Sequence, residues 1–113
     1  MTEVARFLNV WHFNESAPWP TDPVEKAKVG EIMLAAIGKA LETGDLLEFG
    51  YFPDGRGGYA ISEREAKDQL GSCAAFWPWI EADVREMIPY EVGKEALRGV
   101  WKAQAKAMAA MKR

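Results

Sequence analysis

Hydrophobic and polar residues alternate along several short stretches of the chain, and this period of two predicts β-strands. The clearest stretch is residues 6–13, where β-branched and aromatic residues place Phe7 and Trp11 on one side and Leu8 and Val10 on the other. Three more strands are predicted at residues 46–52, at residues 58–61, and from residue 80 as far as Pro89. The turn-rich connector at residues 53–57 predicts that the middle two strands form a hairpin.

A period of 3.6 predicts three helices between and after these strands. The first begins with three signals together, since Asp22 can cap, Pro23 suits the first helical position and Glu25 completes a capping box. Gly44 is placed to end this helix in a left-handed conformation. The predicted apolar stripe consists of Val29, Met33, Ala36, Ile37, Ala40 and Leu41.

The second helix is predicted to open at a capping box in residues 62–65 and to end at Pro78. Its expected apolar face is Ala66, Leu70, Cys73, Ala74 and Trp77. The third helix is predicted at residues 94–112, and an isolated helix of this length is marginal in water. We therefore expect its apolar side to be buried against the domain or across a dimer; this side comprises Leu97, Val100, Trp101, Met108 and Met111.

The predicted order, β-α-β-β-α-β with an added C-terminal helix, indicates an α+β sandwich of the ferredoxin-like type. The 113 residues suit one domain, with residues 94–113 as a helical extension. In this topology both main helices cover one face of a four-stranded sheet. Because the strands carry bulky apolar groups on both sides, the other face needs a cover as well. Either the C-terminal helix or a second subunit would provide it.

The segment at residues 75–84, Ala-Phe-Trp-Pro-Trp-Ile-Glu-Ala-Asp-Val, joins the second helix to the last strand. This aromatic-proline-aromatic junction before a strand of alternating acidic residues resembles the muconolactone isomerase-like small proteins of the dimeric α/β-barrel superfamily. The resemblance covers residues 6–92. It implies a homodimer whose two sheets face each other around a cavity for a small, largely apolar ligand. No catalytic residue of that family matches a position in this chain.

Composition and charge exclude several classes of protein. Cys73 is the only cysteine, so a disulfide framework or a zinc-finger spacing is impossible and a cytoplasmic location is expected. No stretch is long and apolar enough for a membrane span, and a net charge of −3 argues against nucleic acid as a partner. The charge is uneven. Residues 94–113 hold six basic and one acidic side chain, a net of +5, so residues 1–93 hold eight basic and sixteen acidic, a net of −8.

Three side chains are candidates for acid–base catalysis. His12 is one, because histidine is the side chain type whose ordinary pKa lies near neutral pH. Glu81 and Asp83 share one face of the last strand, where burial in a cavity would raise a carboxyl pKa. The alternatives are a locally hydrogen-bonded histidine and two carboxylates that keep an edge strand soluble. The sequence predicts no metal site and no cofactor, since one imidazole with scattered carboxylates lacks a ligand spacing.

Large rings are the candidates for ligand contact. Trp11, Tyr51, Tyr59 and Trp79 could wall a pocket for an aromatic ligand, or they could belong to the core or to a subunit interface. RNA binding is excluded, because the third strand has only Tyr59 where base stacking requires two rings. Two hypotheses remain. One is a small-ligand-binding homodimer, with isomerase-like acid–base chemistry if it is an enzyme. The other is a non-catalytic interaction protein that docks through its sheet face and basic C-terminal helix.

Overall fold

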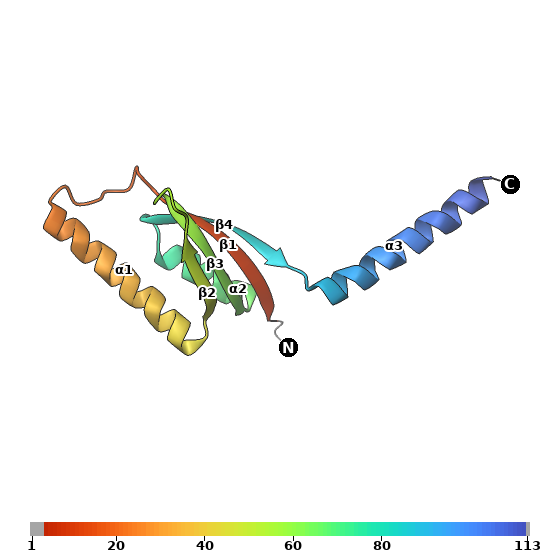
Figure 1. Ribbon diagram of the computed structural model, residues 1–113, viewed down its shortest axis with the longest axis horizontal. Coiled ribbons are helices and arrows are strands. Elements are labelled where there is room, and N and C mark those ends of the chain that lie inside the picture. The colour runs from red at the N-terminus through yellow and green to blue at the C-terminus, as the bar shows by residue number, and fades with distance from the viewer. Residues whose placement is uncertain (1–3, 113) are drawn as a thin grey trace.

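The computed structural model describes residues 4–112 and shows an α+β chain, as the sequence predicts. A four-stranded antiparallel sheet is accompanied by three helices (Figure 1). In chain order the elements are β1 (Ala5–Phe13), α1 (Pro23–Thr43), β2 (Leu46–Tyr51), β3 (Gly57–Arg64), α2 (Ala66–Ala75), β4 (Ile80–Met87) and α3 (Tyr90–Met111).

The strands lie in the order β2-β3-β1-β4, so the first strand of the chain is central. β3 and β4 both run antiparallel to β1, and β2 runs antiparallel to β3. β1 and β2 are therefore parallel, with β3 between them, and α1 makes the crossover that joins them. This arrangement is consistent with a fold of the ferredoxin-like type.

The register divides the side chains of the sheet between two faces. Trp11 pairs with Gly58 on β3 and with Ala82 on β4, while its neighbour His12 pairs with Gly57 and Glu81 on the opposite side. We call the face of Trp11 the inner face, because α1 and α2 lie over it, and the face of His12 the open face. The buried hydrophobic side chains, all on the inner face or on α1, are Phe7, Trp11, Ile37 and Ala60.

Local signals at both ends of α1 act as the sequence predicts. The Asp22 carboxylate accepts a hydrogen bond of 3.1 Å from the Val24 amide, and Pro23 occupies the first turn. Gly44 ends the helix with φ of 86°, a left-handed conformation that costs glycine little. Ile37 is buried, whereas Leu41 of the predicted stripe is exposed.

The β2–β3 hairpin depends on close backbone approach. Gly55 turns the chain with φ of 74°. A Cβ on Gly50 would overlap the ring of Tyr59, which therefore lies directly over Gly50 on the open face. On the inner face, a Cβ on Gly58 would meet the carbonyl oxygen of Gly50 and would lie 2.8 Å from the indole ring of Trp11. These glycines let aromatic rings cover the sheet on both sides.

Two predictions for α2 are wrong. Ser62 does not cap the helix but lies in β3, and the capping position is Glu65, whose side chain makes no capping hydrogen bond. The expected apolar face is also wrong in most of its members: Leu70, and Trp77 beyond the end of the helix, are largely exposed, and only Cys73 of that face lines the inner side. The sheet is contacted instead by the side that carries Gln69, because the polar groups of β3 offer it hydrogen-bond partners.

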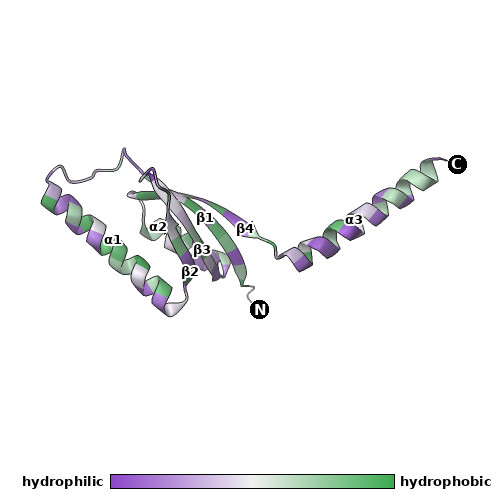
Figure 2. Ribbon diagram, in the orientation of Figure 1, coloured by the Kyte–Doolittle hydropathy of each residue, from purple (hydrophilic) through white to green (hydrophobic). Residues whose placement is uncertain are grey.

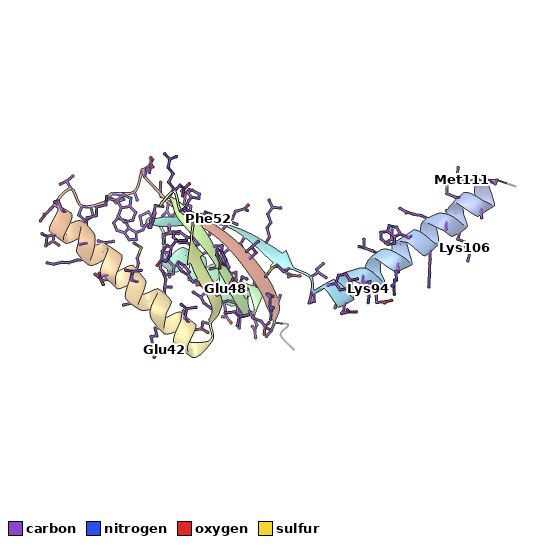
Figure 3. All side chains as sticks on the ribbon, in the orientation of Figure 1. Glu42, Glu48, Phe52, Lys94, Lys106 and Met111 are labelled. Atoms are coloured by element: carbon purple, nitrogen blue, oxygen red, sulfur yellow. The ribbon has the colours of Figure 1, made fainter. Side chains whose placement is uncertain are left out.

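α3 begins at Tyr90, four residues before the predicted start, and projects away from the rest of the molecule (Figure 1). The extents of 75 × 30 × 23 Å reflect this projection. The expectation that its apolar side is buried against the domain is wrong. The five residues of that side are each more than half exposed, namely Leu97, Val100, Trp101, Met108 and Met111. In Figure 3 no other element lies beside the side chains of Lys94, Lys106 and Met111.

Candidate functional site

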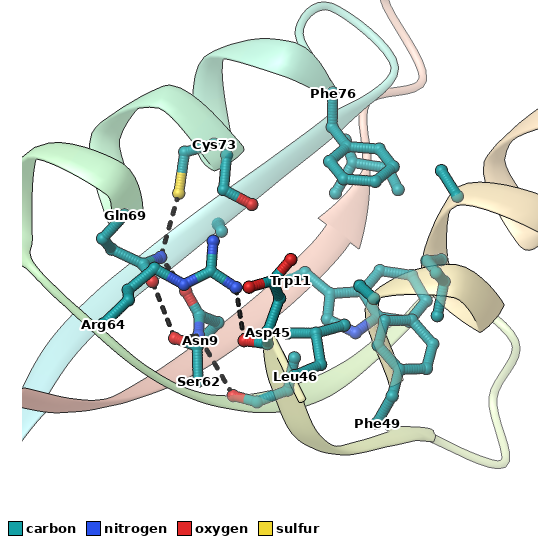
Figure 4. A pocket seen from close by; sticks show the side chains of 17 residues that line it. Asn9, Trp11, Asp45, Leu46, Phe49, Ser62, Arg64, Gln69, Cys73 and Phe76 are labelled. Carbon is teal, nitrogen blue, oxygen red and sulfur yellow. Dashed lines mark hydrogen bonds between the residues drawn. The ribbon is translucent and has the colours of Figure 1, made fainter. Parts of the chain in front are cut away.

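A cavity of about 220 Å³ lies between the inner face of the sheet and the two covering helices. α1 contributes Ile37 and Ala40 to its wall, α2 contributes Cys73, and Phe76 follows directly after α2. Trp11, at the centre of the sheet, forms much of the floor (Figure 4). The lining is mostly apolar with a few polar groups, which is the usual composition of a small-molecule site. For scale, an engineered apolar cavity of about 150 Å³ binds benzene.

One end of the cavity is closed by a cycle of buried side chains. Ser62, only 1% exposed, donates a hydrogen bond of 2.7 Å from its Oγ to Oε1 of Gln69. Gln69 Nε2 donates to Oδ1 of Asn9 at 2.6 Å, and Asn9 Nδ2 donates back to Ser62 Oγ at 3.3 Å (Figure 4). Each side chain in the cycle donates one hydrogen bond to the next and accepts one from the previous. The cycle therefore fixes α2 on β1 and β3, and each of its three buried side chains has hydrogen-bond partners.

Two other polar groups of the wall have no such partner. Nε1 of Trp11 and Nε of Arg64 are buried and form no hydrogen bond with any described residue. Trp11 is only 5% exposed, so its N–H makes no hydrogen bond with bulk water either. A buried donor without an acceptor costs about 1–3 kcal/mol. Each of these atoms exposes less than 1 Å², so an acceptor in the cavity would recover part of that free energy only after the side chains around the donors shift.

The Arg64 guanidinium is held at the rim of the cavity by Asp45. Its Nη2 donates to the backbone carbonyl of Asp45, and Asp45 also lines the cavity. The Asp45 carboxylate accepts instead from the Thr43 hydroxyl at 3.2 Å. Within residues 4–112, no carboxylate forms an ion pair with Arg64. The rim therefore carries both a positive and a negative side chain, while Nε of Arg64 lies buried beneath it.

A row of aromatic rings leads from this cavity toward the junction that precedes β4. Trp11 stacks on Phe49 with ring centroids 5.2 Å apart and lies edge-on to Phe13 at 5.3 Å. Phe13 contacts Trp19, which in turn lies 4.9 Å from Trp79. Offset and edge-to-face pairs of this kind stabilise a cluster beyond simple burial. The rings therefore brace the cavity floor from one side.

The seven residues predicted as site residues do not lie together. Trp11 and Tyr51 share the inner face, with ring centroids 5.9 Å apart, and Trp79 packs at the junction against Trp19. Tyr59 and the three acid–base candidates lie on the open face. Trp11 is thus the one predicted ligand contact that lines the cavity between helices and sheet.

Two of the acid–base candidates are brought into contact. His12 Nε2 lies 3.0 Å from Oε2 of Glu81 across the β1–β4 pairing, with side chains 58% and 42% exposed. Asp83 lies 3.5 Å from Arg85 on the same strand. Exposed pairs of this kind interact weakly, because water and salt screen them. An acid–base role for these three residues, which lie exposed on the open face, stays a prediction.

Tyr59 forms the other polar contact of the open face. Its pKa is raised above the ordinary tyrosine value, first because the hydroxyl hydrogen-bonds to the Glu48 carboxylate, and further because of desolvation and the negative charge of Glu48. The ring covers Gly50 while the hydroxyl reaches the neighbouring residue pair of β2. Tyr59 therefore lies beside Glu48 of β2, on the side of the sheet opposite the cavity.

Sequence reasoning missed most of the polar residues of the cavity, including Asn9, Ser62, Arg64 and Gln69. One signal was present. Asn9 sits between Phe7 and Trp11 on the same face of β1, and a lone amide on an aromatic face implies a buried hydrogen-bonding partner. Nothing in the sequence identified that partner, because Gln69 lies 60 residues away.

Residues 4–112 contain no group of three or more histidine, cysteine, aspartate or glutamate side chains that could hold a metal ion. Within the same residues no helix has both the length and the apolar character needed to cross a membrane. The chain matches no protein-family model, no curated protein and no solved structure.

Proposed function

We propose that the protein binds a small ligand in the cavity between its helices and its sheet, the ligand being a single apolar ring that carries a hydrogen-bond acceptor. The observation that carries the proposal is the unpaired N–H of Trp11, buried in the wall of a cavity of about 220 Å³. The apolar lining favours a ring, and the two unpaired donors favour an acceptor on it.

The proposal is for binding rather than catalysis. His12, Glu81 and Asp83 lie on the open face, so the sheet separates them from a ligand on the inner face. No cofactor enters the proposal. Isomerase-like acid–base chemistry at these three residues stays a prediction and would require a second ligand position on the open face.

Cys73 gives a direct readout of occupancy, because it is the chain's single thiol and lines the cavity. We expect benzamide, which has a ring and a carbonyl acceptor, to slow modification of Cys73 by a thiol reagent. Toluene, which has the ring without the acceptor, should protect Cys73 less. Equal modification rates with and without either compound would contradict the proposal.

A cavity-filling pair of variants provides the control. Ala40→Leu adds volume within the cavity, whereas Ala35→Leu makes the same change on α1 at a residue outside the lining. Protection by benzamide should be lost in Ala40→Leu and kept in Ala35→Leu. Thermal unfolding of both variants would show that the fold is retained.

The fold also supports a second proposal, that this chain is related to the dimeric α/β-barrel proteins. The split pairing of β1 and β2 around β3, with both main helices on one face, is the arrangement expected of a ferredoxin-like, dimeric α/β-barrel protein. We also propose a cytoplasmic location, which the single cysteine predicts.

The alternative is a non-catalytic interaction protein, and one observation favours it. α3 presents an exposed apolar side that no described element covers. A partner that binds there would give this chain a role independent of the cavity. The two functions are separable, because α3 contributes no residue to the cavity.

A further inference from the structure

We infer that the cavity ligand is an aromatic α-amino acid, whose ring enters the cavity while its ammonium and carboxylate groups bind Asp45 and Arg64 at the rim. This inference rests on the ligand site proposed above and names the chemical class of its occupant. The observation behind it is a pair of opposite charges that belong to touching residues and yet form no ion pair. An α-amino acid carries the two complementary charges close together.

The charged residues of the rim come from two segments of the chain. Asp45 lies between the end of α1 and the start of β2, and Arg64 is the last residue of β3. The hydrogen bond from Arg64 Nη2 to the backbone carbonyl of Asp45 joins these segments. Among the described residues that line the cavity these two alone are charged, since the other polar side chains are amides, hydroxyls and a thiol.

Neither charge is neutralised by the rest of the described chain. The ion pairs of residues 4–112 include neither Asp45 nor Arg64. The Asp45 carboxylate accepts a hydrogen bond of 3.2 Å from the neutral hydroxyl of Thr43, and the Arg64 guanidinium donates to a neutral carbonyl. Because Nε of Arg64 is buried, a ligand carboxylate would meet the terminal nitrogens of the guanidinium first. Such contacts are charge-assisted and stronger than hydrogen bonds between neutral groups.

The two opposite charges select a zwitterion over a ligand with one charge. A lone carboxylate that binds Arg64 would lie near the like charge of Asp45, and a lone ammonium that binds Asp45 would lie near Arg64. Each attraction would therefore be offset in part by a repulsion. A zwitterion makes both attractive contacts, and it adds no net charge to a lining whose two charges sum to zero.

The rest of the lining determines the side chain of the amino acid. The ribbon is hydrophilic where β3 passes into α2, the point that Arg64 occupies (Figure 2). Phe49 and Phe76 lie on the other side of the cavity from Arg64, with Trp11 between (Figure 4). The volume of about 220 Å³ exceeds that of the cavity of about 150 Å³ that holds benzene. A phenyl ring therefore fits beside these rings while the charged groups stay at the rim.

Four compounds with the same ring test the inference by isothermal titration. Phenylalanine has both charges, phenylethylamine lacks the carboxylate, phenylpropionate lacks the ammonium, and benzamide has neither charge. We expect phenylalanine to have a dissociation constant at least about tenfold below that of each of the other three. Phenylalanine should also slow modification of Cys73 by a thiol reagent, which places it in the cavity.

Two charge-removing variants should change the order of affinities in opposite ways. Asp45→Asn should weaken phenylalanine about tenfold and strengthen phenylpropionate, because the repulsion from Asp45 is gone. Arg64→Gln should weaken phenylalanine similarly and strengthen phenylethylamine. A gain in affinity cannot result from a damaged fold. Asp54→Asn and Arg6→Gln are the matched controls, because they make the same changes outside the lining, and they should leave all four affinities within about twofold.

The outcomes separate this inference from the proposed function. Phenylalanine that binds no more tightly than its singly charged analogues would overturn the inference, as would unchanged affinity for phenylalanine in Asp45→Asn or Arg64→Gln. If benzamide still slows modification of Cys73 in that case, the proposed ring-binding function stands. Failure of both benzamide and phenylalanine to slow the modification would contradict the inference and the proposed function together.

Discussion

Ser62 on β3 and Gln69 on α2 are joined by a buried hydrogen bond of 2.7 Å, which is the polar contact that holds the second helix on the sheet. α2 has few apolar side chains facing inward, because its one leucine, Leu70, is exposed. The side-chain amide of Gln69 also donates to Asn9 at 2.6 Å. Its hydrogen bonds therefore attach α2 to the sheet at a position where an apolar side chain would usually do so by packing. The cavity lies beside this contact, since Asn9, Ser62 and Gln69 all line it.

Gln69→Ala should lower the free energy of unfolding by about 1–3 kcal/mol, because Ser62 and Asn9 would lose buried partners. Urea unfolding measures the change. Lys67→Ala is the control on the same helix, because Lys67 is 75% exposed and its long contact of 3.6 Å with Glu65 predicts a change of at most about 1 kcal/mol. Similar small losses in both variants would show that the buried cycle contributes little.

The raised pKa of Tyr59 predicts a dependence of stability on alkaline pH. The folded chain holds the hydroxyl proton to a higher pH than the unfolded chain does. The resulting stabilisation is present below the ordinary tyrosine pKa of about 10 and declines as pH rises through the raised value. Tyr59→Phe removes this group. We expect unfolding midpoints from about pH 8 to 11 to decline less steeply in the variant than in the wild type. Parallel declines would contradict the assignment to Tyr59.

The His12–Glu81 pair should matter little for binding in the cavity. His12→Gln and Glu81→Gln remove the charge of an exposed pair on the opposite face of the sheet, so each should change stability by at most about 1 kcal/mol. The dissociation constant for benzamide should stay within about twofold of the wild-type value, which corresponds to a few tenths of a kcal/mol. Isothermal titration measures it. A tenfold loss in either variant would place the ligand on the open face instead.

Signals confined to one element were predictable from the sequence. Asp22, Pro23 and Gly44 determine the ends of α1 through their own backbone preferences and a hydrogen bond two residues away. The alternation along β1 likewise assigns Trp11 and His12 to opposite faces without any knowledge of the partners.

Features that depend on distant partners were not predictable. Ser62 followed three residues later by Glu65 has the pattern of a capping box, but pairing with β1 extends β3 through Arg64 and takes Ser62 into the sheet. The inward side of α2 was misassigned for the same reason, since burial of Gln69 is favourable only beside Asn9 and Ser62. The direction of α3 could not be inferred from its amphipathic pattern, which indicates a partner without saying where that partner lies.

The proposed binding site depends most on the indole N–H of Trp11, which NMR can observe directly. Five tryptophans give five indole signals, and the Trp11 signal is identified by its absence in Trp11→Phe. Titration with benzamide should shift that signal downfield, because the N–H gains an acceptor, while the exposed indoles of Trp77 and Trp101 stay unchanged. Trp11→Phe, which keeps an aromatic ring but lacks the donor, should bind benzamide about tenfold more weakly. A Trp11 signal that does not move at saturating benzamide would contradict the proposed site.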